Sequence, residues 1–345
     1  MAETTAAKET PVSKTPDSFF LGSSPHIAST LSARRLMAYV LISLAPVSVF
    51  GIVLYGLPAL LTILVSVAAA ELAEALFRKI TRQEPRNGDL SAAVTGLLLA
   101  LILPPGVPLW MTALGAVFAI IAAKEFFGGL GANVFNPALI GRAFLLMSFP
   151  VAITTWPAPS LFRALDAQSA ATLADAVSGA TPMGLLKSGA GLESLGAGYG
   201  GIIKTLFFGF HSGCIGESSI LLILAGFIFL LVTGTIDWRA PAAMTASVFV
   251  FSFILGRDPL IAVLGGGVAF GAVFMATDYV SAPITAKGKL IFGFGAGLIT
   301  VLIRQWGNYP EGVTYGILIM NAVTPFLNRL FQKKYGYVKP AKGAK

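Results

Sequence analysis

The chain has 345 residues, of which 55% are hydrophobic and only 12% are charged, and its mean hydropathy is +0.79. Soluble domains carry about 25% charged residues, so this composition excludes a water-soluble globule and predicts an all-α integral membrane protein. The net charge of +8 fits basic cytoplasmic loops and not nucleic-acid binding. A single cysteine and two histidines exclude a disulfide framework, a structural zinc site and a self-contained iron–sulfur cluster, so any redox cofactor is expected to be organic.

The first 35 residues are polar and rich in Thr, Ser and Lys, which predicts a disordered cytoplasmic tail (1–35) and not a cleavable signal peptide. Beyond it, apolar stretches that can cross a bilayer recur along the chain. We expect about ten transmembrane helices, near residues 37–56, 58–77, 90–104, 107–123, 135–155, 219–235, 240–256, 258–277, 289–304 and 312–331. In the eighth, Gly265-Gly266-Gly267 is interpreted as a helix-packing face.

The helices divide into two groups of five, in regions 36–155 and 219–331. A long connection, 156–218, separates them, and a basic cytoplasmic tail, 332–345, follows. With ten spans and a cytoplasmic N-terminus, every basic cluster lies on the cytoplasmic side, as the positive-inside rule requires. Both termini are therefore predicted to be cytoplasmic, and the long connection to lie on the outer face. A five-helix half repeated once must be inverted relative to its partner, so we expect two inverted halves.

The outer connection contains a turn of small residues that ends in a threonine: Asp175-Ala-Val-Ser178-Gly179-Ala180-Thr181-Pro182. Gly179 removes steric bulk, and Pro182 favours an extended or turn conformation at Thr181. The threonine hydroxyl would then face solvent, within reach of a modifying enzyme, with Asp175 as an anionic determinant. An ordinary polar turn is the alternative interpretation.

The segment from Asp175 to Thr181 resembles the flavinylation motif of a family that includes the D-type component of Rnf complexes and the B-type component of sodium-pumping NADH:quinone oxidoreductases. Other blocks are similar to the same family: Lys124-Glu125-Phe126-Phe127-Gly128-Gly129, Asn133-Val-Phe-Asn136-Pro137-Ala138-Leu139-Ile-Gly141-Arg142-Ala143-Phe144, Ala276-Thr277-Asp278-Tyr279-Val280-Ser281-Ala282-Pro283 and Tyr309-Pro310-Glu311-Gly312. These blocks span most of residues 36–331. The short N-terminal tail favours the D-type component over the B-type component.

The resemblance implies a role in redox-driven ion transport. A flavin transferase would attach FMN to Thr181 through a phosphodiester, outside the cytoplasm, where the charge pattern independently places this residue. The implied assembly is an Rnf-type translocase of a bacterial or archaeal cytoplasmic (inner) membrane, which couples electron transfer between ferredoxin and NAD to movement of Na+ or H+. Its other subunits, including a second flavin subunit and iron–sulfur subunits, would carry the ferredoxin and NAD sites. This chain is not expected to be active alone.

Three other functions remain open. A B-type component of a quinone reductase predicts quinone-dependent activity of the complex, and a flavin-free secondary transporter would work alone. A purely structural membrane anchor would need no cofactor. The flavinylation motif argues against the last two, because neither explains a modified threonine on the outer face. The transported ion and the direction of electron flow also stay open.

Four further residues are candidates for ion or cofactor binding. Glu71 and Glu74 lie three residues apart on one face of the second span, and intramembrane carboxylates predict an ion route; the alternative is pairing of Glu74 with Arg78 near the cytoplasmic interface. Asn136 begins the fifth span, whose entrance could hold a polar ligand or ion, with tight helix packing as the alternative. The resemblance implies that a second, non-covalent riboflavin or FMN lies within the bundle. Glu217 opens the sixth span and is another candidate for lining a flavin site, although an acidic residue at a helix start is also ordinary capping chemistry.

Overall fold

The computed structural model describes residues 32–84, 88–157, 159, 181–182, 184, 198–307 and 312–331. Contacts divide the chain into two units, Met1–Ser32 and Ala33–Lys345, and the description below concerns the second. Within the described residues all regular structure is helical, which confirms the predicted all-α class.

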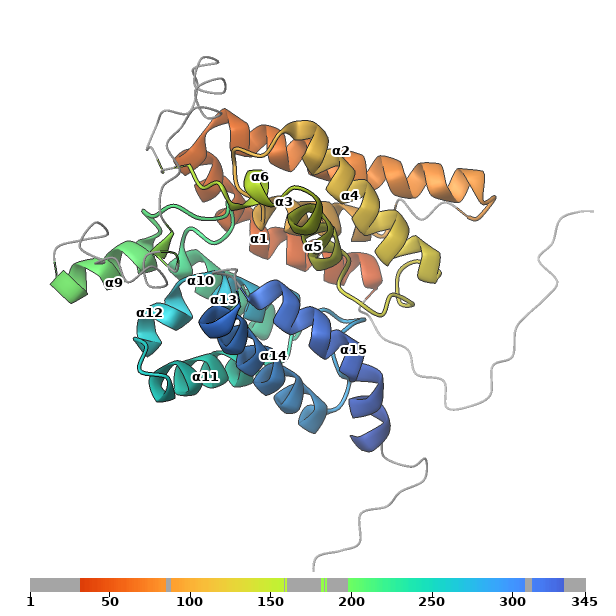
Figure 1. Cartoon of the computed structure of the whole chain (residues 1–345). Helices are drawn as coiled ribbons and strands as arrows, with labels where there is room; N and C mark the ends of the chain where they lie inside the picture. The colour runs from red at the N-terminus through yellow and green to blue at the C-terminus, as the bar shows by residue number, and fades with distance from the viewer. Residues whose placement is uncertain are drawn as a thin grey trace, which may run out of the picture. The chain divides into compact units, whose positions relative to one another are not determined.

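The N-terminal group of helices is coloured red to yellow-green in Figure 1. It comprises α1 (Ala33–Tyr55), α2 (Leu57–Ile80), α3 (Ser91–Leu101), α4 (Leu109–Ala123), the 3-10 turn η1 (Glu125–Phe127), α5 (Pro137–Ser148) and α6 (Pro150–Thr154). Helix α2 packs against both α3 and α4, and α4 packs against α5.

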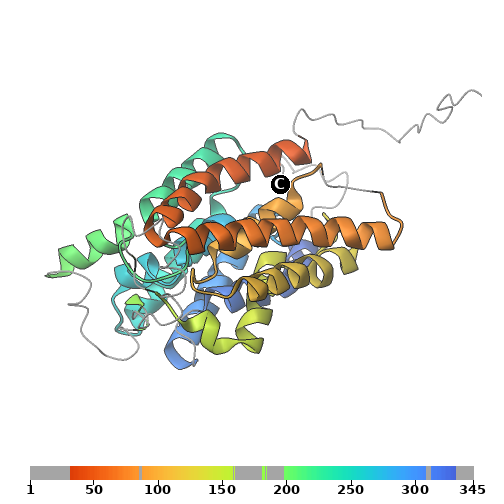
Figure 2. The ribbon, with the colours of Figure 1, turned by 90° about the horizontal axis from the view of Figure 1, so that it is seen from above.

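The C-terminal group is coloured green to blue. It comprises α9 (Gly198–Phe208), α10 (Ile220–Val232), α11 (Arg239–Ile254), α12 (Pro259–Leu264), α13 (Val268–Phe270), the π-helical turn η3 (Gly271–Met275), α14 (Ala286–Trp306) and α15 (Val313–Phe331). Helix α14 packs against α11 and α15, and α1 runs alongside α10 to join the two groups (Figure 2).

Among the described residues, four segments are long and apolar enough to cross a membrane: Ala33–Tyr55, Leu57–Ile80, Leu109–Phe127 and Ala286–Trp306. Large apolar side chains on α2 remain uncovered by protein; Leu72 is 69% exposed and Leu76 is 59% exposed. Such a surface suits lipid and not water. These features support a multi-pass membrane protein.

Each of the ten predicted apolar stretches coincides with helix in the structure, but the third, fifth and eighth differ from continuous spans. The fifth is divided at Phe149 into α5 and α6. Helix α3 has only 11 residues and is followed by Pro104-Pro105, which cannot continue a helix. The eighth stretch comprises α12, α13 and η3, and Gly265-Gly266-Gly267 separates α12 from α13. Gly266 and Gly267 have φ of 65° and 68°, a left-handed conformation that favours glycine. The interpretation of this glycine run as a packing face is therefore wrong, because it breaks the helix.

Candidate functional site

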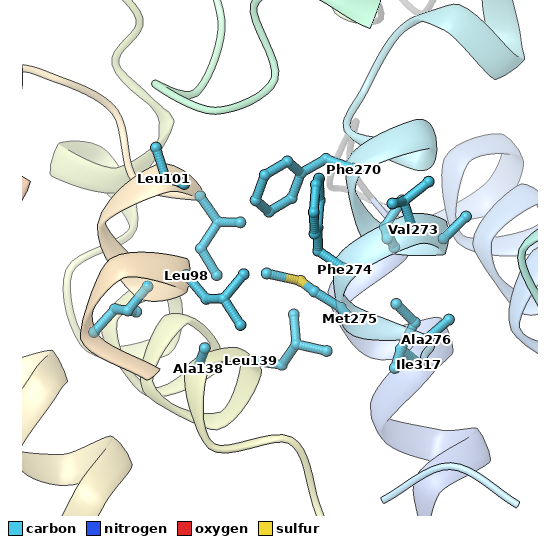
Figure 3. Packing of buried hydrophobic residues seen from close by; sticks show 14 of the residues in the cluster. Leu98, Leu101, Ala138, Leu139, Phe270, Val273, Phe274, Met275, Ala276 and Ile317 are labelled. Carbon is cyan, nitrogen blue, oxygen red and sulfur yellow. The ribbon is translucent and has the colours of Figure 1, made fainter. Parts of the chain in front are cut away.

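Two of the interrupted segments, α3 and α12–η3, meet between the helical groups. Each is the third apolar segment of its group, and paired interruptions at corresponding positions mark the binding region in many membrane transport folds. In Figure 3, Leu98 and Leu101 of α3 lie opposite Phe270, Phe274 and Met275, and all five belong to one buried cluster. The interruptions are therefore buried in protein, as lipid requires of irregular backbone.

Two arginines satisfy the carbonyl groups that these interruptions leave unpaired. Arg142 of α5 donates to the carbonyl of Ile102, at the end of α3, and its guanidinium lies 3.3 Å from the Cys214 sulfur. Arg304 of α14 donates to the carbonyl oxygens of Ala262 (2.6 Å), Gly265 (3.1 Å) and Gly266 (3.0 Å). A cation at the C-terminal end of a helix also complements the helix dipole.

A small cavity lies at this junction, and we call it the junction cavity. Its wall includes Arg142, Cys214 and Glu217 together with the backbone of Gly266 and Gly267. Its volume is about 20 Å³, enough for one water-sized particle.

A larger cavity of about 220 Å³, the loop cavity, lies between the α10–α11 connection and the segment that precedes α14. Asp237 and Lys289 line it. The Asp237 carboxylate forms ion pairs with the Arg239 guanidinium (2.7 Å) and with Lys289 Nζ (3.2 Å). Burial raises the pKa of Asp237, but the hydrogen bonds from Arg239 and Lys289 outweigh this effect and hold the pKa below its usual range. This wall therefore stays charged.

The opposite wall of the loop cavity carries Asp278 and Tyr279. Burial raises the pKa of Asp278, although the Ser281 hydroxyl, which donates at 2.6 Å, opposes the change. Burial also raises the pKa of Tyr279 to about 12, and its hydroxyl donates to the Thr235 carbonyl at 2.5 Å. The cavity thus offers one charged wall and one wall of hydrogen-bonding groups with a suppressed tendency to ionise.

Asn136 lies beside this cavity and begins α5. Its side chain accepts from the N–H groups of Ala138 (3.0 Å) and Leu139 (3.3 Å), so the amide caps the helix, with Pro137 at the first turn. A hollow of about 40 Å³ is lined by Asn136 and shares Ile236, Thr277, Asp278 and Tyr279 with the loop cavity.

Asn321 of α15 connects the two groups at the same place. With its amide oriented to satisfy both neighbours, it accepts from the Asn136 N–H at 3.1 Å and donates to the Ser281 carbonyl at 3.3 Å. Asn321 is fully buried. It therefore fixes α5 against the segment after η3, where Asp278 lies.

Thr181 is 8% exposed, and its hydroxyl oxygen accepts a hydrogen bond from the N–H of Gly184 at 3.0 Å. The hydroxyl is thus held inside a local turn, which differs from the expected solvent-facing orientation. The remaining motif residues, Asp175, Ser178, Gly179 and Ala180, lie outside the described residues.

Glu71 and Glu74 lie elsewhere, toward the end of α2. Glu71 is partly exposed, whereas Glu74 is buried and bonds Lys124 Nζ at 2.9 Å. Arg78 is 3.6 Å from Glu74, which is the pairing considered as the alternative to an ion route, and 3.2 Å from Glu125. These four charges balance one another within a single buried cluster.

Sequence reasoning did not assign roles to Arg142, Asp278 or Asn321. Asp278 carried a usable signal, because a lone carboxylate at the end of an apolar stretch is costly unless it has a function. The sequence alone offers no reason to assign a role to Arg142 or Asn321. In the structure, Arg142 donates to the carbonyl at the end of α3, and Asn321 accepts from the Asn136 N–H.

Comparison with known proteins shows relatives over almost the full chain. The sequence profile of the NQR2, RnfD, RnfE family matches residues 20–336. The D subunit of the proton-translocating ferredoxin:NAD(+) oxidoreductase complex of Clostridium ljungdahlii is 42% identical over 92% of this chain and 96% of the relative. The D subunit of the Na(+)-translocating ferredoxin:NAD(+) oxidoreductase complex of Acetobacterium woodii is 41% identical over 94% and 98%. The D subunit of the ion-translocating oxidoreductase complex of Stutzerimonas stutzeri is 37% identical over 90% and 94%.

Proposed function

The chain belongs to the NQR2, RnfD, RnfE family, and we propose that it is the D-type membrane component of an ion-translocating ferredoxin:NAD oxidoreductase complex. The observation that carries this proposal is the identity of 42% and 41% to two proteins of that name over nearly their whole length. The other subunits of the complex would supply the ferredoxin and NAD sites, including a second flavin subunit and iron–sulfur subunits. The bacterial cytoplasmic membrane is the proposed location.

In this proposal Thr181 carries FMN through a phosphodiester, attached by a flavin transferase. The threonine supplies the hydroxyl that such a bond requires, and Pro182 and the Gly184 N–H fix its conformation. Because Thr181 is 8% exposed, the turn between Thr181 and Gly184 has to open for attachment. Bound flavin would supply electron transfer, while the chain supplies the position of the flavin and its surroundings.

A second, non-covalent riboflavin or FMN is proposed for the loop cavity and the adjoining hollow beside Asn136. The residues present fit such a group. Lys289, paired with Asp237, offers a cation, Thr277 and Tyr279 offer hydroxyl groups, and Asp278 offers a carboxyl group. The apolar part of the wall comes from Ile236, Ala240, Ala276, Ala282, Pro283 and Ile284. Ligand sites of this kind combine an apolar lining with a few fixed polar groups.

The proposed topology has ten spans, two inverted halves and both termini in the cytoplasm, with Thr181 on the outer face. Matching helix pairs support the repeat, because α2 packs on α4 as α11 packs on α14, and α4 packs on α5 as α14 packs on α15. Ion translocation would use two arrangements of this bundle whose balance depends on the redox state. Glu71 and Glu74 remain proposed residues of the ion route.

The flavin assignment is tested by fluorescence of the protein band on a denaturing gel, after expression with the flavin transferase. We expect a fluorescent wild-type band and a dark band for Thr181→Ala, because only the hydroxyl can form the phosphodiester. Thr154→Ala is the matched control, since it makes the same change at an exposed threonine, and it should stay fluorescent. A dark wild-type band with an active transferase would contradict the assignment.

A further inference from the structure

Glu217 is a buried carboxylate without a partner among the residues that the structure describes. The residue is 6% exposed, and within that part of the chain its side chain makes no hydrogen bond or ion pair. Helix capping does not explain it either, because the N-cap of α10 is Ser219 and no side-chain capping bond is formed there. A carboxylate in such a position is a candidate ligand for a small cation.

The carboxyl group faces the break in the eighth segment. A Cβ placed on Gly267 would lie 3.6 Å from a Glu217 carboxylate oxygen, so the left-handed glycine leaves the space that the carboxylate faces. Glu217 is also part of the wall of the junction cavity. The cavity volume of about 20 Å³ excludes a flavin ring and admits one ion or one water.

Several ionisable groups surround Glu217. From its own segment, His211 lies on the other side of Gly213, and both side chains come within 3.7 Å of the position that a Cβ would occupy there. Burial lowers the pKa of His211, so its imidazole is neutral near neutral pH, and its Nε2 atom has no hydrogen-bond partner among the described groups. Tyr55 of α1 and Arg142 of α5 are the groups that face this region from the packed helices, together with Cys214.

We propose that Glu217 binds one small monovalent cation, Na+ or H+, in the junction cavity. The proposal rests on the function proposed above and names one site at which the translocated ion would be held. A proton would add to a carboxylate oxygen, and Na+ would pair directly with the carboxylate. The two relatives described above have names that specify different ions, so the chemistry common to both is a single positive charge.

The position of Glu217 gives the bound cation a way to affect the packing of the halves. The Gly216 N–H donates to the Leu101 carbonyl at 2.7 Å, and the Ile215 N–H donates to the Leu103 carbonyl at 3.2 Å, so the Glu217 segment is fixed to the end of α3. Its carboxylate faces Gly267, before α13. Neutralising Glu217 therefore changes the interaction between α3 and the segment α12–η3. A cation that binds one arrangement of the helix bundle more tightly than the other shifts the population toward that arrangement.

The test uses the whole complex, reconstituted in vesicles, with infrared difference spectroscopy of carboxyl groups. Wild type should show a carboxyl band that responds to NaCl but not to choline chloride if Na+ binds, or to pH alone if H+ binds. Glu217→Gln should remove the band and lower ion uptake per electron about tenfold. Glu84→Gln, the same change at an exposed glutamate of the α2–α3 connection, should leave the band and the uptake unchanged.

If Glu217→Gln does not assemble, Glu217→Asp keeps the charge on a shorter side chain, and it should shift the midpoint of the cation response about tenfold. A wild-type spectrum in Glu217→Gln with normal uptake, or an unchanged midpoint in Glu217→Asp, would overturn the site. Failure of the proposed function looks different, since the wild-type complex would then lack ferredoxin:NAD activity while the Glu217 band still responded to cations.

Discussion

Burial of the Lys124 ammonium group depends on its partners. Lys124 is 1% exposed and donates to Glu74 at 2.9 Å and to the Ser91 hydroxyl at 2.6 Å. These bonds join the end of α4 to α2 and to the start of α3. A buried ion pair of this kind adds little net stability over apolar residues, but loss of one partner leaves an uncompensated buried charge. The contacts of Lys124 with Glu74 and Ser91 therefore specify how α2, α3 and α4 pack together.

Lys124→Met is expected to lower the free energy of unfolding by about 3–5 kcal/mol, because it leaves the Glu74 carboxylate buried beside Glu125 with only Arg78 to balance both. The double variant Lys124→Met with Glu74→Gln restores a neutral cluster and should lose much less than the sum of the two single variants. Denaturant unfolding in detergent micelles measures all four proteins. If the loss of unfolding free energy in the double variant equals the sum of the losses in the two single variants, the Lys124–Glu74 pair does not cause the destabilisation.

At the scale of elements, glycine allows helices to approach until backbone touches backbone. A Cβ at Gly297 of α14 would lie 2.6 Å from the Met244 carbonyl of α11, and one at Gly293 would overlap the Ala240 carbonyl. A Cβ at Gly96 of α3 would likewise lie 2.8 Å from the Ser66 carbonyl of α2. Without a hydrophobic driving force between helices in lipid, such close packing supplies much of the association energy.

Gly297→Ala should therefore destabilise the protein by about 1–3 kcal/mol, because the added methyl group forces α14 away from α11. Gly200→Ala is the matched control. It makes the same change in α9, where nothing lies within 4 Å of the new Cβ, and it should be neutral or stabilise by up to about 1 kcal/mol through helix propensity. Thermal unfolding of both variants in one detergent compares them directly. Equal effects would contradict close packing of α11 on α14.

The positions of helices followed from the sequence because apolar stretches of spanning length are a strong pattern, whereas the interruptions did not. Pro104-Pro105 indicated the end of α3, but the glycines at 265–267 could equally form a packing face or a break. Only the positive φ of Gly266 and the bonds from Arg304 decide between them. Likewise, Glu217 and Asn136 were candidates from the sequence, while the cavities beside them depend on contacts between distant segments.

Over the whole molecule, exposed tryptophans lie at helix ends, as at membrane–water interfaces. Trp110 begins α4 and is 57% exposed, and Trp306 ends α14 and is 68% exposed. If the halves are inverted, α4 and α14 run in opposite directions and both tryptophans fall on the outer face. If the halves are parallel, the two residues fall on opposite faces. Trp238, at the start of α11, is 55% exposed and falls on the cytoplasmic face in the inverted arrangement, which therefore places exposed tryptophans at both interfaces.

Single cysteines test this arrangement, and the native Cys214 gives little background because it is 3% exposed. Gly106→Cys, before α4, and Lys204→Cys, on α9, should react in intact cells with a maleimide that does not cross the membrane. Lys79→Cys, near the end of α2, and Lys287→Cys, at the start of α14, should react only after permeabilisation. All four positions are exposed, so protection reports the face and not burial. Reaction of Gly106→Cys and Lys287→Cys from the same face would contradict inversion, since α4 and α14 would then start together.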